Sequence, residues 1–143
     1  MNIIEQLQDK DNKKAYDLCQ ELSRESSESN KYYPYFNDFI SLLSSKNAYV
    51  RTRGFILACA QAQWDKDNLL AKNLDTLLKV LYDEKPIVVR KGLAALPEVI
   101  LYHPELSQKI NTYLNQIDLT KYPDSMSPLI KKDIQELQKS LNI

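Results

Sequence analysis

The stretch Asn47–Ala62, NAYVRTRGFILACAQA, decides the fold because it has a partner 38 positions downstream, Pro86–Leu101, PIVVRKGLAALPEVIL. The only two glycines in the chain, Gly54 and Gly92, coincide at this offset. Glycine costs roughly 1 kcal/mol relative to alanine inside a helix, so its recurrence at one register indicates that helices approach closely there. The offset also aligns apolar residues in pairs: Phe36/Leu74, Phe39/Leu77, Ile40/Leu78, Leu42/Val80, Leu43/Leu81, Tyr49/Ile87, Val50/Val88, Phe55/Leu93, Ile56/Ala94, Leu57/Ala95 and Ala58/Leu96.

A period of 38 residues made of two helices is typical of helical repeat stacks. Hydrophobic periodicity and helix start signals predict about eight helices in four antiparallel pairs. The expected helices are Ile3–Leu7, 12–24, one from Pro34, 48–62, 68–82, one from Pro86, one from Pro104 to Ile117, and 128–141. The polar run 25–30 is expected to be a loop, and Asp65 or Asp67 is expected to cap the helix that follows. Pro97 predicts a kink or a break one turn earlier in its helix.

The expected organisation is a single domain over residues 1–143, a size at which a chain can bury a substantial core. It divides into a degenerate repeat, two regular repeats and a C-terminal capping repeat, at 1–30, 31–64, 65–103 and 104–143. The final helix has one apolar face and one polar face, as a terminal repeat without a further neighbour requires.

At residues 47–54 the chain resembles the HEAT and HEAT-like armadillo repeats. The second helix of that family opens with a polar turn, then Val-Arg, then a small residue three positions later, and Val50, Arg51 and Gly54 match this order. In the second copy Val88 holds the valine position, and the arginine follows one residue late at Arg90. The resemblance implies an all-α superhelix, a short right-handed solenoid, and implies no particular activity.

Composition points to a helical chain with no strong overall field. Two glycines in 143 residues argue against a loop-rich or β-rich fold. Lysine plus arginine and aspartate plus glutamate number 19 each, so the net charge does not attract nucleic acid or an anionic membrane. No apolar run approaches the ~20 residues of a membrane span, and the N-terminal sequence lacks a secretory signal pattern, so we expect a cytoplasmic protein.

The residue types needed for catalysis or cofactor binding do not occur together. His103 is the only histidine and directly precedes Pro104, which indicates a helix boundary rather than a zinc or nucleophile site. No glycine-rich phosphate loop is present. Cys19 and Cys59 fall in apolar helical segments and are expected to be reduced, packed thiols. The sequence therefore predicts a protein that is not an enzyme, with no cofactor and no metal.

Basic residues recur near the starts of successive second helices and form the main candidate binding feature. A stack aligning them along one edge would hold an acidic peptide or a phosphate backbone. The alternative is that the arginines pair with acids of neighbouring repeats, such as Asp38, Asp75, Asp83 or Glu84. The candidate residues are Arg51, Arg53, Arg90, Lys91, Lys131 and Lys132, together with Trp64 in a loop.

Aromatic residues crowd the start of one helix at Tyr32, Tyr33, Tyr35 and Phe36. Tyrosine and tryptophan are enriched at binding hot spots, and the alternative is that these side chains pack across grooves between helices.

Two classes of function remain. The favoured hypothesis is a scaffold or interaction module whose concave face, lined by second helices, receives a protein partner or another copy of the chain. A lyase-like or chaperone-like accessory protein would use the same face. The competing hypothesis comes from HEAT-like proteins that bind damaged DNA and excise alkylated bases. That reading requires a strongly basic concavity, interleaved aromatics and a catalytic carboxylate, and the balanced charge argues against it.

Overall fold

The structure, a computed structural model, describes residues 2–141 and 143, and all regular secondary structure in that part is helical. The expected all-α class is therefore confirmed. The α-helices are α1 (Ile3–Gln6), α2 (Asn12–Ser26), α3 (Phe36–Ser41), α4 (Ala48–Ala60), α5 (Leu69–Lys72), α6 (Leu74–Leu78), α7 (Pro86–Tyr102), α8 (Ser107–Asn115) and α9 (Ser127–Lys139). Short 3-10 helices are η1 (Tyr33–Tyr35), η2 (Leu42–Ser44), η3 (Ala62–Trp64), η4 (Lys79–Tyr82), η5 (Pro104–Leu106) and η6 (Leu119–Lys121).

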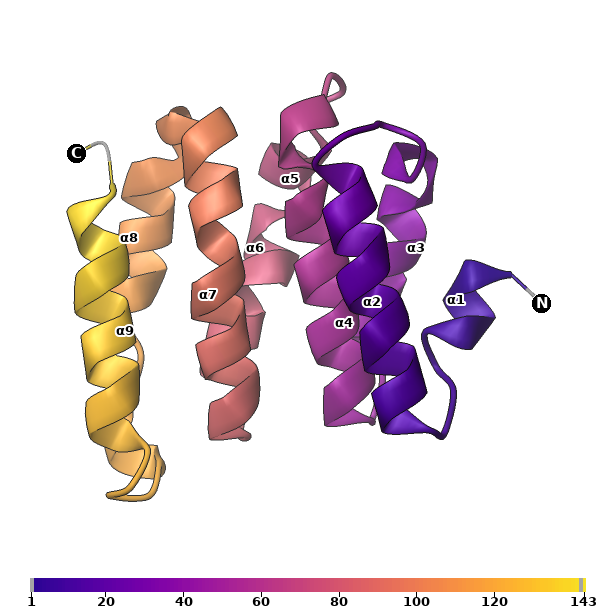
Figure 1. The fold of residues 1–143 in the computed structure, drawn as a ribbon. Coiled ribbons are helices and arrows are strands. Elements are labelled where there is room, and N and C mark those ends of the chain that lie inside the picture. Colours follow the sequence, from indigo (N-terminus) through magenta and orange to yellow (C-terminus); the bar gives the residue numbers. More distant parts are fainter. Residues whose placement is uncertain (1, 142) are drawn as a thin grey trace.

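The four longest helices stand side by side and form one layer (Figure 1). Within this layer α2 contacts α4, α4 contacts α7, and α7 contacts α9. The shorter helices α3, α5, α6 and α8 lie behind them in the view of Figure 1. Both α3 and η2 pack on α4, whereas η4 packs on α7. All four long helices begin at the same end of the layer, at the bottom of Figure 1.

Local side-chain caps fix where several helices begin. The Asn47 side chain accepts a hydrogen bond from Tyr49 N at 2.9 Å and caps α4. Asp65 was one of two expected caps, and its carboxylate accepts from Leu69 N at 2.8 Å and Leu70 N at 2.9 Å. The Asp65 prediction is thus confirmed, because this carboxylate binds two of the N–H groups that a helix leaves free in its first turn.

Two expectations about helix continuity differ from the structure. The predicted helix 68–82 is divided into α5, α6 and η4, with Asn73 (φ −109°) at the junction between α5 and α6. A kink or a break was expected one turn before Pro97, and the break does not occur, since α7 continues through this residue to Tyr102. Pro97 is exposed, so its ring faces away from the buried side of the helix, where packing of Leu96 and Val99 holds α7 together.

The two glycines lie at equivalent contacts, but only one is tight. A Cβ added to Gly54 would lie 2.6 Å from Phe39 O and 2.7 Å from Leu42 Cβ. One added to Gly92 would meet Val80 Cγ1 at an ordinary 3.4 Å. Leu42 and Val80 are themselves 38 residues apart, so the same contact recurs at the sequence offset. The close approach predicted from both glycines is confirmed at Gly54 and is wrong at Gly92.

One cluster of buried hydrophobic residues extends from Leu7 in the chain to Leu137 and passes between the two layers. The cluster includes both cysteines, Cys19 and Cys59, which are free thiols. Among the described residues, no helix has the length and hydropathy that crossing a bilayer requires.

Candidate functional site

The basic residues predicted as a row along one edge point in different directions. Arg51 and Arg53 are two residues apart, which separates their side chains by about 200° around α4. The Arg51 guanidinium holds Asp83 through two hydrogen bonds, from Nε to Oδ2 at 2.8 Å and from Nη2 to Oδ1 at 3.1 Å. Its Nη1 donates to Ser45 O at 3.0 Å. Arg51 therefore ties α4 to the turn between η4 and α7. The alternative interpretation, that the arginines pair with acids such as Asp83, is met at this residue.

Arg53 points to the opposite side and is almost completely buried. Its guanidinium donates to Leu7 O at 2.8 Å and to the Asn12 side-chain oxygen at 3.0 Å, so it fixes the connection between α1 and α2. Its Nε has no hydrogen-bond partner, and no carboxylate within ion-pair distance is present among the described residues. Burial lowers the pKa of this guanidinium. The positive charge of Arg53 is therefore held inside the protein without a paired acid.

The remaining basic candidates divide into two kinds. Arg90 on α7 donates from Nε to Asp133 Oδ2 on α9 at 2.7 Å. Lys91 reaches the other way, to the Tyr16 hydroxyl on α2 at 3.0 Å, and its Nζ lies 5.0 Å from the centroid of that ring. Lys131 and Lys132 are exposed on α9. The structure thus brings Lys91 to a groove and leaves the two α9 lysines apart from it.

The predicted aromatic candidates make contacts within the chain. Trp64 Nε1 donates to Ser26 O at 2.6 Å, which joins η3 to the C-terminal end of α2. The Tyr32 hydroxyl donates to Glu25 at 2.8 Å, and the Tyr33 hydroxyl to Asp67 at 2.8 Å. Within the predicted cluster, Phe36 is buried and Tyr32 packs against the core, as the alternative interpretation predicts, whereas Tyr35 is exposed.

A groove runs along the surface of α4 between α2 and α7, and we call it the α4 groove. Its lower part, the N-terminal cavity, is about 550 Å³ and is lined by residues from the first turns of the three helices. Its upper part, the C-terminal cavity, is about 380 Å³. Tyr16 on α2 and Lys91 on α7 line both parts. The hydrogen bond between them spans the groove over the surface of α4 and separates the two cavities.

The N-terminal cavity combines an apolar surface with positive charge. Tyr49 on α4 is 59% exposed and Ile87 on α7 is 49% exposed, although both are large apolar side chains. Lys13, Lys85 and Lys91 also line it, and none of the described residues that line it is acidic. Lys13 pairs with Asp17 at 3.0 Å, whereas Lys85 forms no ion pair within the described part of the chain.

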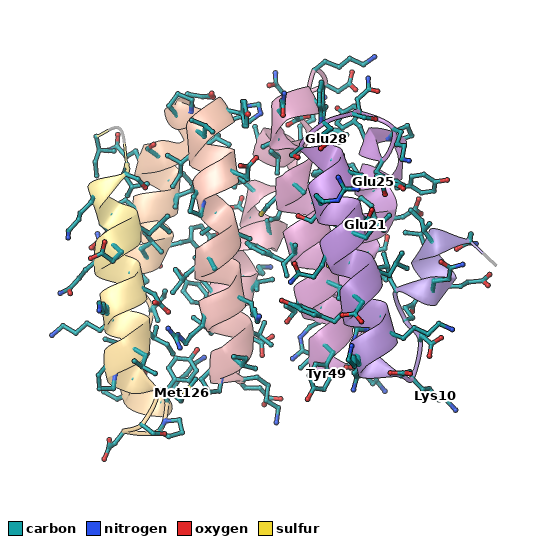
Figure 2. The ribbon with its side chains drawn as sticks, viewed as in Figure 1. Lys10, Glu21, Glu25, Glu28, Tyr49 and Met126 are labelled. Carbon is teal, nitrogen blue, oxygen red and sulfur yellow. The ribbon has the colours of Figure 1, made fainter. Side chains whose placement is uncertain are left out.

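Two acidic residues of α2, Glu21 and Glu25, lie toward the other end of this layer, whereas Asp17 lies about one turn from Lys13 and pairs with it. Figure 2 shows Glu21 and Glu25 on the upper half of α2 and Glu28 just beyond its C-terminal end, whereas Tyr49 lies at the lower end of α4. The N-terminal cavity also lies at the ends where α2, α4 and α7 begin, and helix N-termini carry partial positive charge. This end of the groove is therefore electropositive.

A second groove lies between α7 and α9 and has mixed charge. It is about 500 Å³ and is lined by Arg90, Lys91, Asp133 and Glu136 together with apolar residues. The Arg90–Asp133 ion pair crosses it. Because its cations and acids are both present and partly paired, this groove has less preference for a charged ligand than the α4 groove.

The histidine and the two cysteines singled out in the sequence occupy a helix end and the buried core. His103 caps the end of α7, as predicted, and its Nε2 lies 2.9 Å from Ala62 O. Burial raises the pKa of the Cys19 thiol to about 12 and also raises that of Cys59, which makes both poor nucleophiles. Among the described residues, no group of three or more His, Cys, Asp or Glu side chains is arranged to hold a metal ion.

Sequence reasoning missed the residues that shape the α4 groove, namely Tyr16, Tyr49, Lys85 and Ile87. A signal was present in the repeat itself, since Tyr49 and Ile87 are aligned by the 38-residue offset and both occupy the first turn of a helix. The sequence shows that both are apolar residues at matching positions, but it does not show that their side chains are exposed. No protein-family model, curated protein or solved structure matches the chain in comparisons with known proteins.

Proposed function

We propose that this protein is a non-catalytic interaction module of the HEAT-like type, a short right-handed α-solenoid that binds a protein partner on the layer of α2, α4, α7 and α9. Its four helix pairs would be α1/α2, α3/α4, α5–α6/α7 and α8/α9. The order of contacts within the long-helix layer supports this assignment. The recurrence of the Gly54–Leu42 contact at Gly92 and Val80 supports the two central repeats.

The observation that carries the proposal is the exposure of Tyr49 and Ile87 at the mouth of a cavity of about 550 Å³. Large apolar side chains beside a groove are a common feature of binding surfaces. Tyrosine in particular offers a large contact area with few rotatable bonds. Lys85 and Lys91 at the same cavity add a means of selecting a partner by its charge.

Site-specific photocrosslinking in the source cell tests which layer meets the partner. Tyr49 is replaced by the photoreactive residue benzoylphenylalanine, and a matched variant carries it at Tyr35, which is 36% exposed among the shorter helices. We expect a covalent adduct from position 49 and none from position 35. An adduct of twice the mass of the chain would identify the partner as a second copy. Equal adducts at both positions, or adducts from position 35 alone, would contradict the proposal.

DNA binding remains the competing function. The α4 groove offers lysines and the aromatic residues Tyr16 and Tyr49, but no described residue of its N-terminal cavity is a carboxylate that would serve base excision. A mobility shift of duplex DNA at physiological salt, weakening steeply as salt rises, would favour this alternative. The interaction proposal predicts no shift under those conditions.

A further inference from the structure

The hydrogen bond from Lys91 to Tyr16 is the only direct side-chain link across the α4 groove among the described residues. It joins residues 75 positions apart, and the groove continues on both sides of it. Lys91 forms no ion pair with a described residue. Its ammonium group donates to the neutral hydroxyl of Tyr16 instead. A carboxylate offered by a ligand would bind Lys91 more strongly than the phenol does, because hydrogen bonds between charged groups are the stronger kind.

Two lysines at the lower half of the groove, Lys85 and Lys91, form no ion pair with any described residue, whereas Lys13 there is paired with Asp17. Lys85 stands at the start of α7, and Lys91 lies six residues, fewer than two turns, further along the helix. Arg53 lines the same cavity from below, and its buried guanidinium has an unpartnered Nε and no paired carboxylate. A buried cation without a counterion favours an anion nearby. The groove is thus complementary to negative charge at its lower end.

The surface of α4 within the groove admits an elongated ligand. Four of the α4 side chains that line the two cavities are short or apolar, at Ala48, Thr52, Ile56 and Ala60. They follow one another at intervals of four residues and so lie along one face of the helix. At 1.5 Å per residue, the 13 residues of α4 give this face a length of about 20 Å. Three to four turns of a second helix fit this length.

We propose that the α4 groove binds an acidic amphipathic helix of a partner protein, which lies along α4 between α2 and α7. Apolar side chains of that helix pack in the N-terminal cavity against Tyr49 and Ile87. Its carboxylates pair with Lys85 and with Lys91. Lys91 then gives up its hydrogen bond to Tyr16, and the two cavities join into one channel. This inference rests on the proposed function and adds the chemical class of the partner.

The test is selection from a displayed library of random 16-residue peptides against the full chain. We expect the enriched peptides to carry several Asp or Glu residues and an apolar residue repeated every three or four positions. Their affinity is measured by fluorescence anisotropy for the wild type and for Lys85→Glu/Lys91→Glu. The double substitution is expected to weaken binding tenfold or more. A carboxylate at position 85 suits a helix N-terminus, so the variant is expected to fold.

The matched control is Lys131→Glu/Lys132→Glu, which makes the same change of net charge at exposed positions of α9 that line neither cavity. It is expected to bind the peptides as the wild type does. A second variant, Tyr16→Phe, removes the hydroxyl that accepts from Lys91 and keeps the ring. It is expected to tighten binding by about two- to tenfold, the range that one hydrogen bond contributes. A role limited to stability would not produce tighter binding.

Enriched peptides that are neutral or basic would overturn the inference, as would equal losses in the two double variants or a failure to enrich any peptide. A parallel selection offers random duplex DNA to the chain. If duplexes were enriched and their binding were lost in Lys85→Glu/Lys91→Glu, the lysines would recognise phosphate groups instead of carboxylates. The crosslinking result at Tyr49 and Tyr35 is independent of peptide charge. A position-49 adduct together with non-acidic peptides would refute the acidic partner and leave the interaction surface in place.

Discussion

Replacing Gly54 or Gly92 by alanine should change the free energy of unfolding in opposite directions. At Gly54 the new methyl group would lie 2.6 Å from the Phe39 carbonyl oxygen and 2.7 Å from Leu42 Cβ. Neither atom is at the end of a flexible side chain, so α3 and η2 would have to retreat from α4. Such overpacking costs about 1–3 kcal/mol, here at the upper end, and better helix propensity offsets about 1 kcal/mol of it. We expect Gly54→Ala to lower the free energy of unfolding by about 2 kcal/mol.

Gly92→Ala is the matched comparison. Its methyl group would meet Val80, Leu81 and Phe55 at 3.4 to 3.7 Å, which is ordinary van der Waals contact. The propensity gain then dominates, and we expect this variant to be more stable than the wild type by about 0.5–1 kcal/mol. The two variants should therefore differ by roughly 3 kcal/mol.

Urea unfolding followed by the fluorescence of Trp64 measures both changes, since the indole is partly buried and hydrogen bonded in the folded state. Unchanged m-values would show that the midpoints report stability. The reasoning about helix approach would be refuted if Gly54→Ala were as stable as Gly92→Ala, or if both substitutions were destabilising to the same degree.

Three further predictions concern side chains that join the helices. A double-mutant cycle on Arg51→Ala and Asp83→Ala should give a coupling of about 1–2 kcal/mol, because the bidentate pair is largely shielded from solvent. Asp65→Ala should cost about 2 kcal/mol in urea unfolding by removing the cap of α5. Cys19 and Cys59 should react with Ellman's reagent at pH 8 only after unfolding. Stability should fall above about pH 9, where thiols of the unfolded chain ionise and the folded Cys19 thiol, with a pKa of about 12, does not.

Controls separate these effects from general destabilisation. The pair Lys13–Asp17 is exposed at 86% and 63%, so its cycle should show a much smaller coupling than that of Arg51 and Asp83. Equal couplings in the two cycles would contradict the role given to burial. Asp67→Ala should cost less than Asp65→Ala, since Asp67 caps no N–H of α5. Rapid thiol reaction of the folded protein would show that Cys19 and Cys59 are accessible.

The apolar pattern of the sequence predicted the all-helical class because it records which helix faces are buried. The offset that aligns Gly54 with Gly92 also aligns their contacts, Leu42 and Val80. It did not give the distance of approach, which depends on how α3, η2 and η4 are placed. The division of 68–82 was missed for a similar reason. Its apolar stripe continues across Asn73, while the backbone there leaves helical geometry.

The candidate site was predictable only in part. The recurrence of basic residues correctly pointed to Lys91 as a residue of the candidate site. It also placed Arg51 and Arg53 together on one edge, which is wrong because residues two positions apart on a helix point to opposite sides. The contact of Lys91 with Tyr16 spans 75 residues and no local pattern reports it. Exposure of Tyr49 and Ile87 follows from the groove between three helices, which exists only once the layer has formed.

Amide chemical shifts of the isotope-labelled chain, followed as the most enriched acidic peptide is added, test the binding surface most directly. We predict shifts concentrated in α2, α4 and α7 around Tyr16, Thr52, Ile87 and Lys91, with little change in α3, α6 and α8. Shifts centred on the layer of shorter helices, or spread evenly over both layers, would contradict binding along α4.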